Sequence, residues 1–432
     1  MQHAPWLYRL VFLALSFPQL AAAGEPLTLA QAIAQTESNN PALAAEGEYA
    51  RAMQAVAPQV GSLPDPVFSL NALNLPTNSF SGTQEAMSQF QLGISQALPL
   101  PHKRELRAAI ADLNAEAVSL NRDEFRLQSI YLATALWWNI FYLDHALATV
   151  SRNQQLLRQL IQVAESKYSV GQGLQQDVLL AQVELSKLLD MAIQLQSARR
   201  QDRVRLNALR HVEVHQGIDL PAQVSEQLEP LPAEAKLIMQ ALHSRPLLAQ
   251  AHTRTRIAHA QHELAEQDFY PDFDLGAAYG IRQGSNRANL ASIRLSMSLP
   301  FFTSDKQNHR LQQRKAEVAQ AEFAYDDAKD RIQSELSQAI IVYEQAREQS
   351  RLFKLGIIPQ AQQTVAAMRA AYQVNAVDFL NLVRAQITLY NYENQYWKAV
   401  AEARQSLAKV ERTIGAAIDL PIATNMQELS HE

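Results

Sequence analysis

The sequence predicts a mainly α-helical protein that is internally duplicated, with long antiparallel coiled-coil helices and four strands that contribute to a membrane β-barrel. Three observations predict this fold class. Landmarks recur about 205 residues apart, four long stretches contain neither glycine nor proline, and four short runs alternate apolar and polar residues.

The two halves of the chain share landmarks in the same order. Pro66, which opens an alternating run, recurs as Pro271, 205 residues later, and Tyr168 recurs as Tyr372, 204 residues later. This unit is much longer than the roughly 20 to 50 residues of solenoid repeats. We infer that a whole architectural half was duplicated, consisting of a short helix, a strand hairpin and two very long helices.

The long helices are predicted from the positions of the helix breakers. Residues 102–170 contain no glycine or proline, and neither do 174–216, 301–355 and 360–414. A helix over the first stretch would be roughly 100 Å long. Within it, apolar residues over 110–141 alternate three and four apart, which is typical of helices that supercoil around one another.

The strands are predicted from runs with a period of two. In residues 273–281, Phe273 and Leu275 alternate with Asp274 and Gly276. A tilted strand of about this length can cross a bilayer, although a soluble sandwich with one wet face would show the same alternation. Four strands cannot close on themselves, and open edges are not tolerated in lipid. If the strands lie in a membrane, several chains must therefore share one barrel.

The N-terminus has the composition of a secretory signal peptide. Arg9 precedes an apolar stretch over 10–17, and small residues follow at 21–23. Because the apolar stretch is too short to span a bilayer, we expect residues 1–23 to be removed and the mature chain to lie beyond the inner membrane.

Charge and cysteine content exclude several classes of protein. The formal net charge is −5, with 38 basic against 43 acidic residues, so the chain has no basic footprint for a nucleic-acid partner. It contains no cysteine, which excludes disulfides, thiolate metal sites and a lipid-anchored N-terminal cysteine.

These signals predict the domain organisation. It consists of a signal peptide (1–23), a first repeat (24–215), a linker (216–232), a second repeat (233–415) and a C-terminal tail (416–432). In the first repeat we expect strands at about 66–75 and 88–98 and long helices at about 102–168 and 174–212. In the second repeat we expect strands at about 272–282 and 291–299 and long helices at about 303–371 and 377–414.

Together, these features resemble the TolC family of outer-membrane efflux channels over essentially all of the mature chain. The resemblance implies a homotrimer in the outer membrane, in which each protomer gives four strands to a shared 12-stranded β-barrel and its helices to a periplasmic α-barrel. It implies a periplasmic adaptor and an inner-membrane pump as partners, outer-membrane lipid around the barrel, no cofactor and no enzymatic activity.

Short motifs resemble the subgroup that serves heavy-metal pumps of the resistance-nodulation-division (RND) type. They are Ser62-Leu-Pro-Asp-Pro66, Asn74-Leu-Pro76, Met87, Ser95-Gln96, Leu98-Pro-Leu-Pro101 and Lys103-Arg104. An exit duct for drugs or secreted proteins in the same fold is an alternative. A periplasmic coiled-coil adaptor or structural rod is an alternative of another class.

The resemblance places a periplasmic gate and adaptor-docking site at the tips of the two long helical hairpins. A sharp reversal favours a left-handed residue, which glycine supplies freely and asparagine tolerates better than most. The residues carried over by position are Tyr168, Gly171, Asp177, Tyr372, Asn375, Asn381 and Arg384, to which Asp378 is added as a neighbouring carboxylate.

The second tip departs from the family pattern. Well-known members carry paired aspartates that form a cation-attracting ring, where this chain has Asn381 and Arg384. Asp177 and Asp378 could supply charge from neighbouring positions, because symmetry copies each carboxylate once per protomer. A helix-capping role for these aspartates is the alternative.

Other constellations predict little chemistry. His252, His259 and His262, with Glu266, come near one helical face, and His211 and His215 form a second pair, but such spacing is common on wet helices. We expect no metal site, because conduction requires release. The Trp137-Trp138 pair predicts a packed belt where the two halves meet. No hydrolase or metalloprotease motif is present in the sequence.

Overall fold

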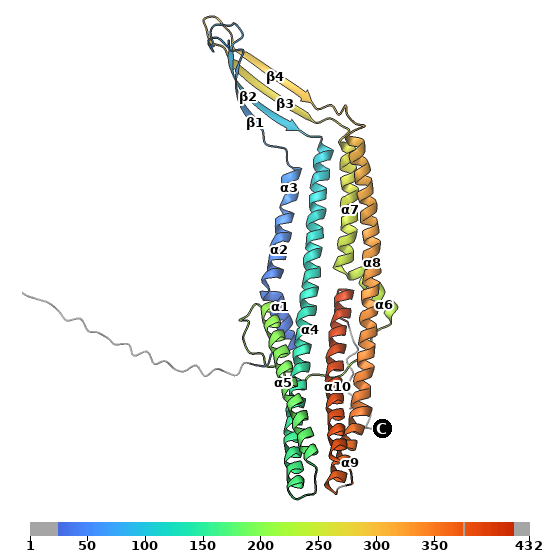
Figure 1. The fold of residues 1–432 in the computed structure, drawn as a ribbon. Coiled ribbons are helices and arrows are strands. Elements are labelled where there is room, and N and C mark those ends of the chain that lie inside the picture. Colours follow the sequence, from blue (N-terminus) through green and yellow to red (C-terminus); the bar gives the residue numbers. More distant parts are fainter. Residues whose placement is uncertain (1–24, 375, 419–432) are drawn as a thin grey trace, which may run out of the picture.

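The computed structural model describes residues 25–374 and 376–418 (Figure 1). It is an elongated bundle of helices with a four-stranded sheet at one end and two helical hairpin tips at the other. This confirms the predicted fold class of a mainly helical chain with antiparallel strands. The predicted signal peptide (1–23) and most of the predicted tail (416–432) lie outside the described residues.

The same order of elements occurs twice. In each half, short helices lead to a strand hairpin and then to a long helix that returns along the bundle. The first half contains α1 (Leu29–Asn39), α2 (Pro41–Gln54), α3 (Val56–Gly61), β1 (Val67–Leu73), β2 (Gln89–Leu98), α4 (Pro101–Ser169) and α5 (Gln175–Leu209). The second contains α6 (Glu234–Ser244), α7 (Pro246–Gln267), β3 (Phe273–Ile281), β4 (Leu290–Met297), α8 (Gln307–Leu352), a π-helical turn (Phe353–Ile357), α9 (Ile358–Gln373) and α10 (Phe379–Ile414).

Each half forms two columns of helices. The helix α4 runs the whole length beside a column in which α1, α2 and α3 pack on its upper part and α5 on its lower part (Figure 1). In the second half, α8 and α9 make the long column, and α7 and α10 share the other. The halves meet where α4 contacts α7 and α10.

The helix α4 begins and ends where local chemistry requires. Pro101 occupies its first position, where the missing N–H has no intrahelical partner to lose. The helix then runs for 69 residues without a breaker and ends two residues before Gly171, whose φ of 70° reverses the chain.

The sequence predicts one uninterrupted helix over 303–371, but the structure divides this stretch. The helix α8 starts at Gln307, and the π-helical turn 353–357 separates it from α9. Pro359 follows directly, and its ring lacks an N–H and would crowd the carbonyl of Leu355, four residues earlier. The wider π turn relieves this conflict, so the column continues instead of breaking.

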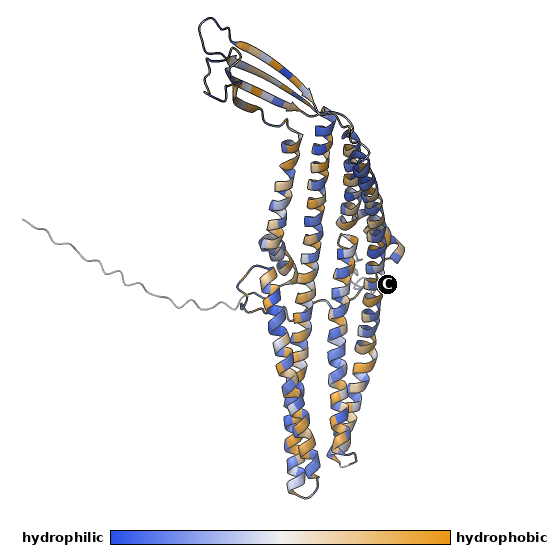
Figure 2. Ribbon diagram, turned by 45° about the horizontal axis from the view of Figure 1, so that its top comes forward, coloured by the Kyte–Doolittle hydropathy of each residue, from blue (hydrophilic) through white to orange (hydrophobic). Residues whose placement is uncertain are grey.

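The sheet has one apolar and one polar face. All neighbouring strands are antiparallel in the order β1-β2-β3-β4, and the register aligns Phe68, Ile94, Ala277 and Ile293 on one face. Three of these apolar side chains are more exposed than buried, Phe68 at 66%, Ile94 at 54% and Ile293 at 85%. The other face carries serine, glutamine, glycine and Arg294, and Figure 2 shows the resulting alternation along the strands.

The sheet ends in two free edges. Within the described residues, β1 pairs only with β2 and β4 only with β3, so the outer backbone groups of both edge strands have no partner strand. In the same ranges, none of the helices combines the length and apolar character needed to cross a bilayer.

A core of aromatic residues joins the two halves at mid-height. Trp137 and Trp138 of α4 are buried against Tyr396 and Val400 of α10, and the Trp137 Nε1–H donates to the carbonyl of Leu27 at 2.9 Å. This agrees with the packed belt that the sequence predicts.

The linker 216–232, which we call the strap, crosses the helices. It contains no helix or strand. Arg199 of α5 donates to the carbonyl of Ile218 at 2.9 Å, and Arg404 of α10 donates to that of Ser225 at 2.8 Å. Glu226 accepts from Lys354, within the π-helical turn, at 2.6 Å. The strap therefore ties α5 and α10 to the irregular turn.

A buried ion pair fastens α7 to α4. Arg245 is the residue before α7, equivalent to Asn40 before α2, but only Asn40 caps its helix, by accepting from Ala42 N at 2.9 Å. The Arg245 guanidinium instead makes two hydrogen bonds to Glu124, at 2.9 and 2.7 Å, and its side chain is 1% exposed. Asn40 in the first half therefore makes a local helix cap, whereas the equivalent Arg245 in the second half makes a contact between the halves.

We predict that Arg245→Ala lowers the free energy of unfolding by about 3 to 5 kcal/mol, because it leaves Glu124 with an uncompensated charge in a mostly buried position. Arg256→Ala is the matched control. Its pair with Glu116 is about half exposed on both sides, so the loss should stay below about 1 kcal/mol. Denaturant titration of the helical circular dichroism signal, at one protein concentration, checks both values. Equal losses in the two variants would contradict the buried-pair argument.

Candidate periplasmic gate at the hairpin tips

The two hairpin turns have the same backbone geometry. Val170 after α4 has φ −99° and ψ 11°, and Val374 after α9 has φ −98° and ψ 13°. The first turn closes with Gln172 N donating to Lys167 O at 2.8 Å, and the second with Ala376 N donating to Ala371 O at 2.9 Å. These donors and acceptors are 204 residues apart, the spacing of the sequence repeat.

The glycines of the first turn act differently. Gly171 has a φ of 70°, and a Cβ there would meet nothing within 4 Å. A Cβ on Gly173 would lie 3.1 Å from the backbone nitrogen of Tyr168, so Gly173 allows the chain to fold back closely. The prediction singled out Gly171 alone. Asn375, expected to replace glycine in the second turn, lies outside the described residues.

The two equivalent tyrosines have different surroundings. Tyr168 is half exposed at the outer tip, whereas Tyr372 is 7% exposed and packs on Phe379 with ring centroids 5.5 Å apart. Burial is the main cause that raises the pKa of the Tyr372 hydroxyl, and the charge of Asp177 adds to it. Tyr372 is therefore a packing residue between the hairpins.

Lys167 connects the two hairpins. Its ammonium donates to the carbonyl oxygen of Tyr372 at 2.9 Å and lies 4.0 Å from the centre of the Tyr372 ring. Lys167 and Phe379 are not among the site residues predicted from the sequence. A lysine in the last turn of a helix and a phenylalanine at the first position of another were the available signals, but neither identifies its partner.

An apolar cluster holds the tips together above these contacts. Leu157, Leu160 and Ala164 of α4 and Ala181 of α5 pack against Phe379, Leu382 and Val383 of α10. Higher up, the buried Gln386 Nε2–H donates to Asn153 Oδ1 at 2.8 Å. Both hairpins of one chain thus form a single packed end.

The hairpin tips bring the carboxylates of Asp177 and Asp378 close enough for the charge of one to affect the other. The Asp378 side chain caps α10 by accepting from Asn381 N at 2.9 Å, as the capping alternative expected. Asp177 lies in the first turn of α5, where burial raises the pKa of its carboxyl and the charge of Asp378 raises it further. The tips therefore bring these two acidic groups together, although 201 residues separate them in the sequence.

Asn381 and Arg384 lie on the exposed side of α10. The Asn381 backbone serves the cap on Asp378. Within the described ranges, the Arg384 side chain makes no hydrogen bond or ion pair. A guanidinium so placed is available to a group outside the chain.

A groove runs above the tip between α4, α5 and α10. Its volume is about 330 Å³, and its lining includes Leu157, Leu188, Met191, Val383 and Ile387. The exposed lining of the groove is mainly apolar, which suits another helix better than a small polar ligand.

The histidines considered for metal binding do not converge. His259 lies 3.6 Å from Glu322, and His262 lies 3.8 Å from Glu266 on its own helix. In the part of the chain that the structure describes, no three histidine, aspartate or glutamate side chains are grouped to hold a metal ion.

Comparison with known proteins shows what the second half of the chain is similar to. The sequence model described as outer membrane efflux protein matches residues 237–416, from α6 to the end of α10. This match covers less than half of the chain.

Individual proteins resemble the chain over most of its length. Outer membrane efflux protein BepC of Brucella suis biovar 1 (strain 1330) is 25% identical over 68% of the chain and 65% of BepC, slightly less than two thirds of that relative. The cobalt-zinc-cadmium resistance protein CzcC of Cupriavidus metallidurans is 22% identical over 92% of both chains. The solved structure of CusC has the same fold, with a TM-score of 0.76 at 16% identity, over 90% of this chain and 92% of CusC.

We predict that acidic pH favours the packed, closed state of the hairpin tips. A carboxyl whose pKa is raised in the packed state binds a proton there more tightly than in a hydrated state. The stabilisation of the packed tip by protonated Asp177 is thus fully present below the ordinary carboxyl pKa, and it is lost as pH rises through the raised pKa. If opening hydrates Asp177, single-channel conductance in planar bilayers should fall as pH is lowered through this window.

Asp177→Asn should remove this pH dependence, because the amide does not titrate. Asp190→Asn, at an exposed position of α5, is the control and should retain it. A conductance profile that is the same in both variants would show that Asp177 does not control the tip.

Proposed function

We propose that the chain is the exit duct of a tripartite efflux system, through which substrate driven by an inner-membrane pump leaves the periplasm. The observation that carries this proposal is the sheet. It has an exposed apolar face, a polar face and two free edges, as expected of one part of a barrel shared between copies. No covalent step is involved, and the work consists of conduction and gating.

We propose a homotrimer, with β4 of one protomer paired to β1 of the next in a 12-stranded barrel. The helices support this assembly, because α5 exposes Leu179, Val183 and Ile193, at 54%, 52% and 63%, on a surface that α4 leaves uncovered. Neighbouring protomers would cover this surface and extend the helical columns into a periplasmic α-barrel.

The tips are the proposed gate, with Tyr168, Gly171, Asp177, Tyr372, Asn375, Asp378, Asn381 and Arg384 at or beside the two turns. A periplasmic adaptor that binds the dilated tip more tightly than the closed one would shift the population towards the open duct. The apolar groove between α4, α5 and α10 is the surface we assign to a helix of that adaptor. An RND-type pump is the proposed source of the driving force.

Heavy-metal cations are the proposed substrate. The likeness to CzcC, a cobalt-zinc-cadmium resistance protein, extends over 92% of both chains, and the solved CusC structure has the same fold. The polar sheet face is rich in serine and glutamine and pairs Arg294 with Asp274 at 3.4 Å, so it offers no dense anionic trap. Weak interaction suits a duct, because an ion that binds tightly is not released.

Drugs or secreted proteins are the alternative substrates within the same fold, and the likeness to the outer membrane efflux protein BepC, whose name specifies no substrate, is compatible with them. The alternative of another class, a periplasmic adaptor or structural rod, is less compatible with the match of residues 237–416 to outer membrane efflux proteins.

A growth comparison tests the substrate class. We expect a strain lacking this chain to become sensitive to cobalt, zinc or cadmium, with growth inhibited at several-fold lower concentrations, while its tolerance of dyes and detergents is unchanged. The intact gene supplied in trans should restore growth on the metals. Sensitivity to dyes with normal growth on metals would exclude the metal proposal and favour a drug duct.

We predict that Arg384→Ala increases closed-state conductance in planar bilayers. In our proposal the Arg384 guanidinium bridges to a carboxylate or carbonyl of an adjacent protomer, and loss of one charge-assisted hydrogen bond of about 1.5 kcal/mol changes the ratio of open to closed states about tenfold. Arg369→Ala, at an exposed position of α9 in the same hairpin, is the control and should behave as the parent protein. An unchanged closed-state conductance in Arg384→Ala would remove Arg384 from the gate.

A further inference from the structure

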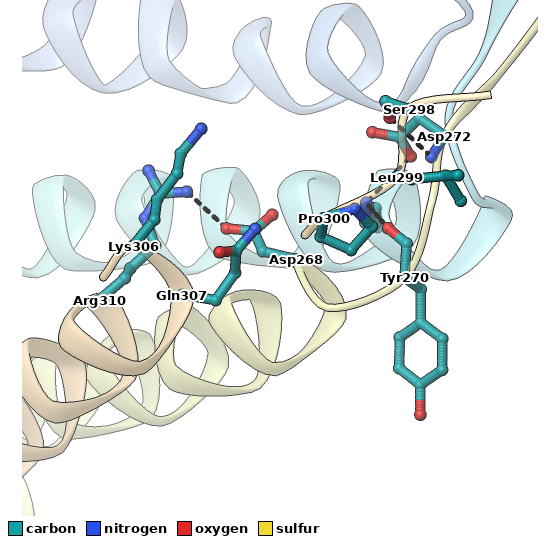
Figure 3. Close-up of a pocket in the computed structure, with 10 residues that line it drawn as sticks. Asp268, Tyr270, Asp272, Ser298, Leu299, Pro300, Lys306, Gln307 and Arg310 are labelled. Carbon is teal, nitrogen blue, oxygen red and sulfur yellow. Dashed lines mark hydrogen bonds and ion pairs between the residues drawn. The ribbon is translucent and has the colours of Figure 1, made fainter. Parts of the chain in front are cut away.

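A polar cavity lies where the strands end and the long helices begin (Figure 3). Its volume is about 550 Å³. Charged and amide side chains dominate its lining, namely Lys103, Asp268, Asp272, Lys306, Gln307 and Arg310. It lies at the opposite end of the helices from the tips, so it has no part in the proposed gate.

The cavity lies at the boundary of the apolar sheet face. The apolar rows of that face end at Leu98 and Met297. Phe301 and Phe302 follow Met297 by four and five residues, and 79% and 76% of their surfaces are exposed. Exposed aromatic residues beside an apolar band mark the level of lipid head groups in membrane barrels. Since the helices extend into the periplasm, this level is that of the periplasmic leaflet.

One cationic side chain of the cavity forms no ion pair within the described residues. Lys103 Nζ donates to Asp272 Oδ1 at 3.0 Å and to the Tyr270 carbonyl at 2.9 Å, and Arg310 pairs with Asp268. The Lys306 ammonium has no hydrogen bond or ion pair with any described residue. Lys306 also precedes the first turn of α8, which lacks a side-chain cap, so the positive end of the helix dipole adds to its charge.

One buried hydrogen-bond acceptor of the cavity also lacks a donor within the described residues. Gln307 is 8% exposed, and its Oε1 has no hydrogen-bond partner among the residues that the structure describes. Figure 3 shows its side chain beside Asp268. A buried acceptor without a donor is unfavourable, and an ammonium group from a ligand would supply the donor.

We propose that this cavity binds a phospholipid of the periplasmic leaflet whose head group carries both a phosphate and a primary amine. The phosphate would pair with Lys306 and the first turn of α8, and the ammonium with Gln307 Oε1 and Asp268. The acyl chains would lie along Phe301, Phe302 and the apolar sheet face. The inference rests on the outer-membrane location and not on the identity of the exported substrate.

Native mass spectrometry of the assembled, detergent-extracted protein tests this proposal. The probes are phosphatidylethanolamine, phosphatidylglycerol, diacylglycerol and soluble phosphoethanolamine. We expect phosphatidylethanolamine to bind most tightly and Lys306→Gln to weaken it about tenfold. Lys315→Gln, at an exposed position of α8, is the control and should bind as the parent protein does. Gln307→Leu should remove the preference for phosphatidylethanolamine over phosphatidylglycerol, and circular dichroism verifies that all variants are folded.

Three results would overturn the proposal. Equal binding by Lys306→Gln and Lys315→Gln would show that the cavity does not hold the phosphate. Binding of diacylglycerol as tight as that of phosphatidylethanolamine would show that the lipid contacts only the apolar surface. Binding of soluble phosphoethanolamine as tight as that of the lipid would identify a free phosphate compound as the ligand.

Discussion

The free edges of β1 and β4 are the constraint on which the rest of the structure depends. A strand edge in hydrocarbon leaves backbone N–H and C=O groups without partners, and water is not available to replace them. Four strands with an apolar outer face therefore cannot be a finished object in a membrane. In the proposed trimer, other copies would likewise cover the exposed apolar residues of α5 at the helical end.

The positions of the long helices could be predicted because helix breaking is local. The sequence places a helix at 102–168, and α4 spans Pro101–Ser169. The π-helical turn at 353–357 could not be predicted in the same way, since Pro359 can either end a helix or be absorbed by a wider turn. Packing of α9 on α10 and the strap at Glu226 favour the second outcome here.

At the candidate gate, too, the local backbone could be predicted from the sequence, whereas the tertiary contacts could not. The turns themselves were predictable from Gly171 and from the repeat spacing, because reversal needs a particular backbone conformation. The roles of the residues around them were not. Tyr168 and Tyr372 are the same residue at equivalent positions, yet only Tyr372 is covered by the other hairpin, through contacts with Lys167 and Phe379. Equivalence in a duplicated sequence therefore indicates backbone position and not burial.

The π-helical turn has a mechanical consequence. In the first half, α4 is one unbroken strut from the sheet to the tip, whereas its counterpart in the second half contains a joint with weaker local hydrogen bonding. A force applied at the mouth is transmitted rigidly along α4 but bends the second strut at residues 353–357 first. In the proposed duct, each copy of the chain would therefore supply one stiff wall and one compliant wall, and widening of the mouth would begin with the lever formed by α9 and the lower part of α10.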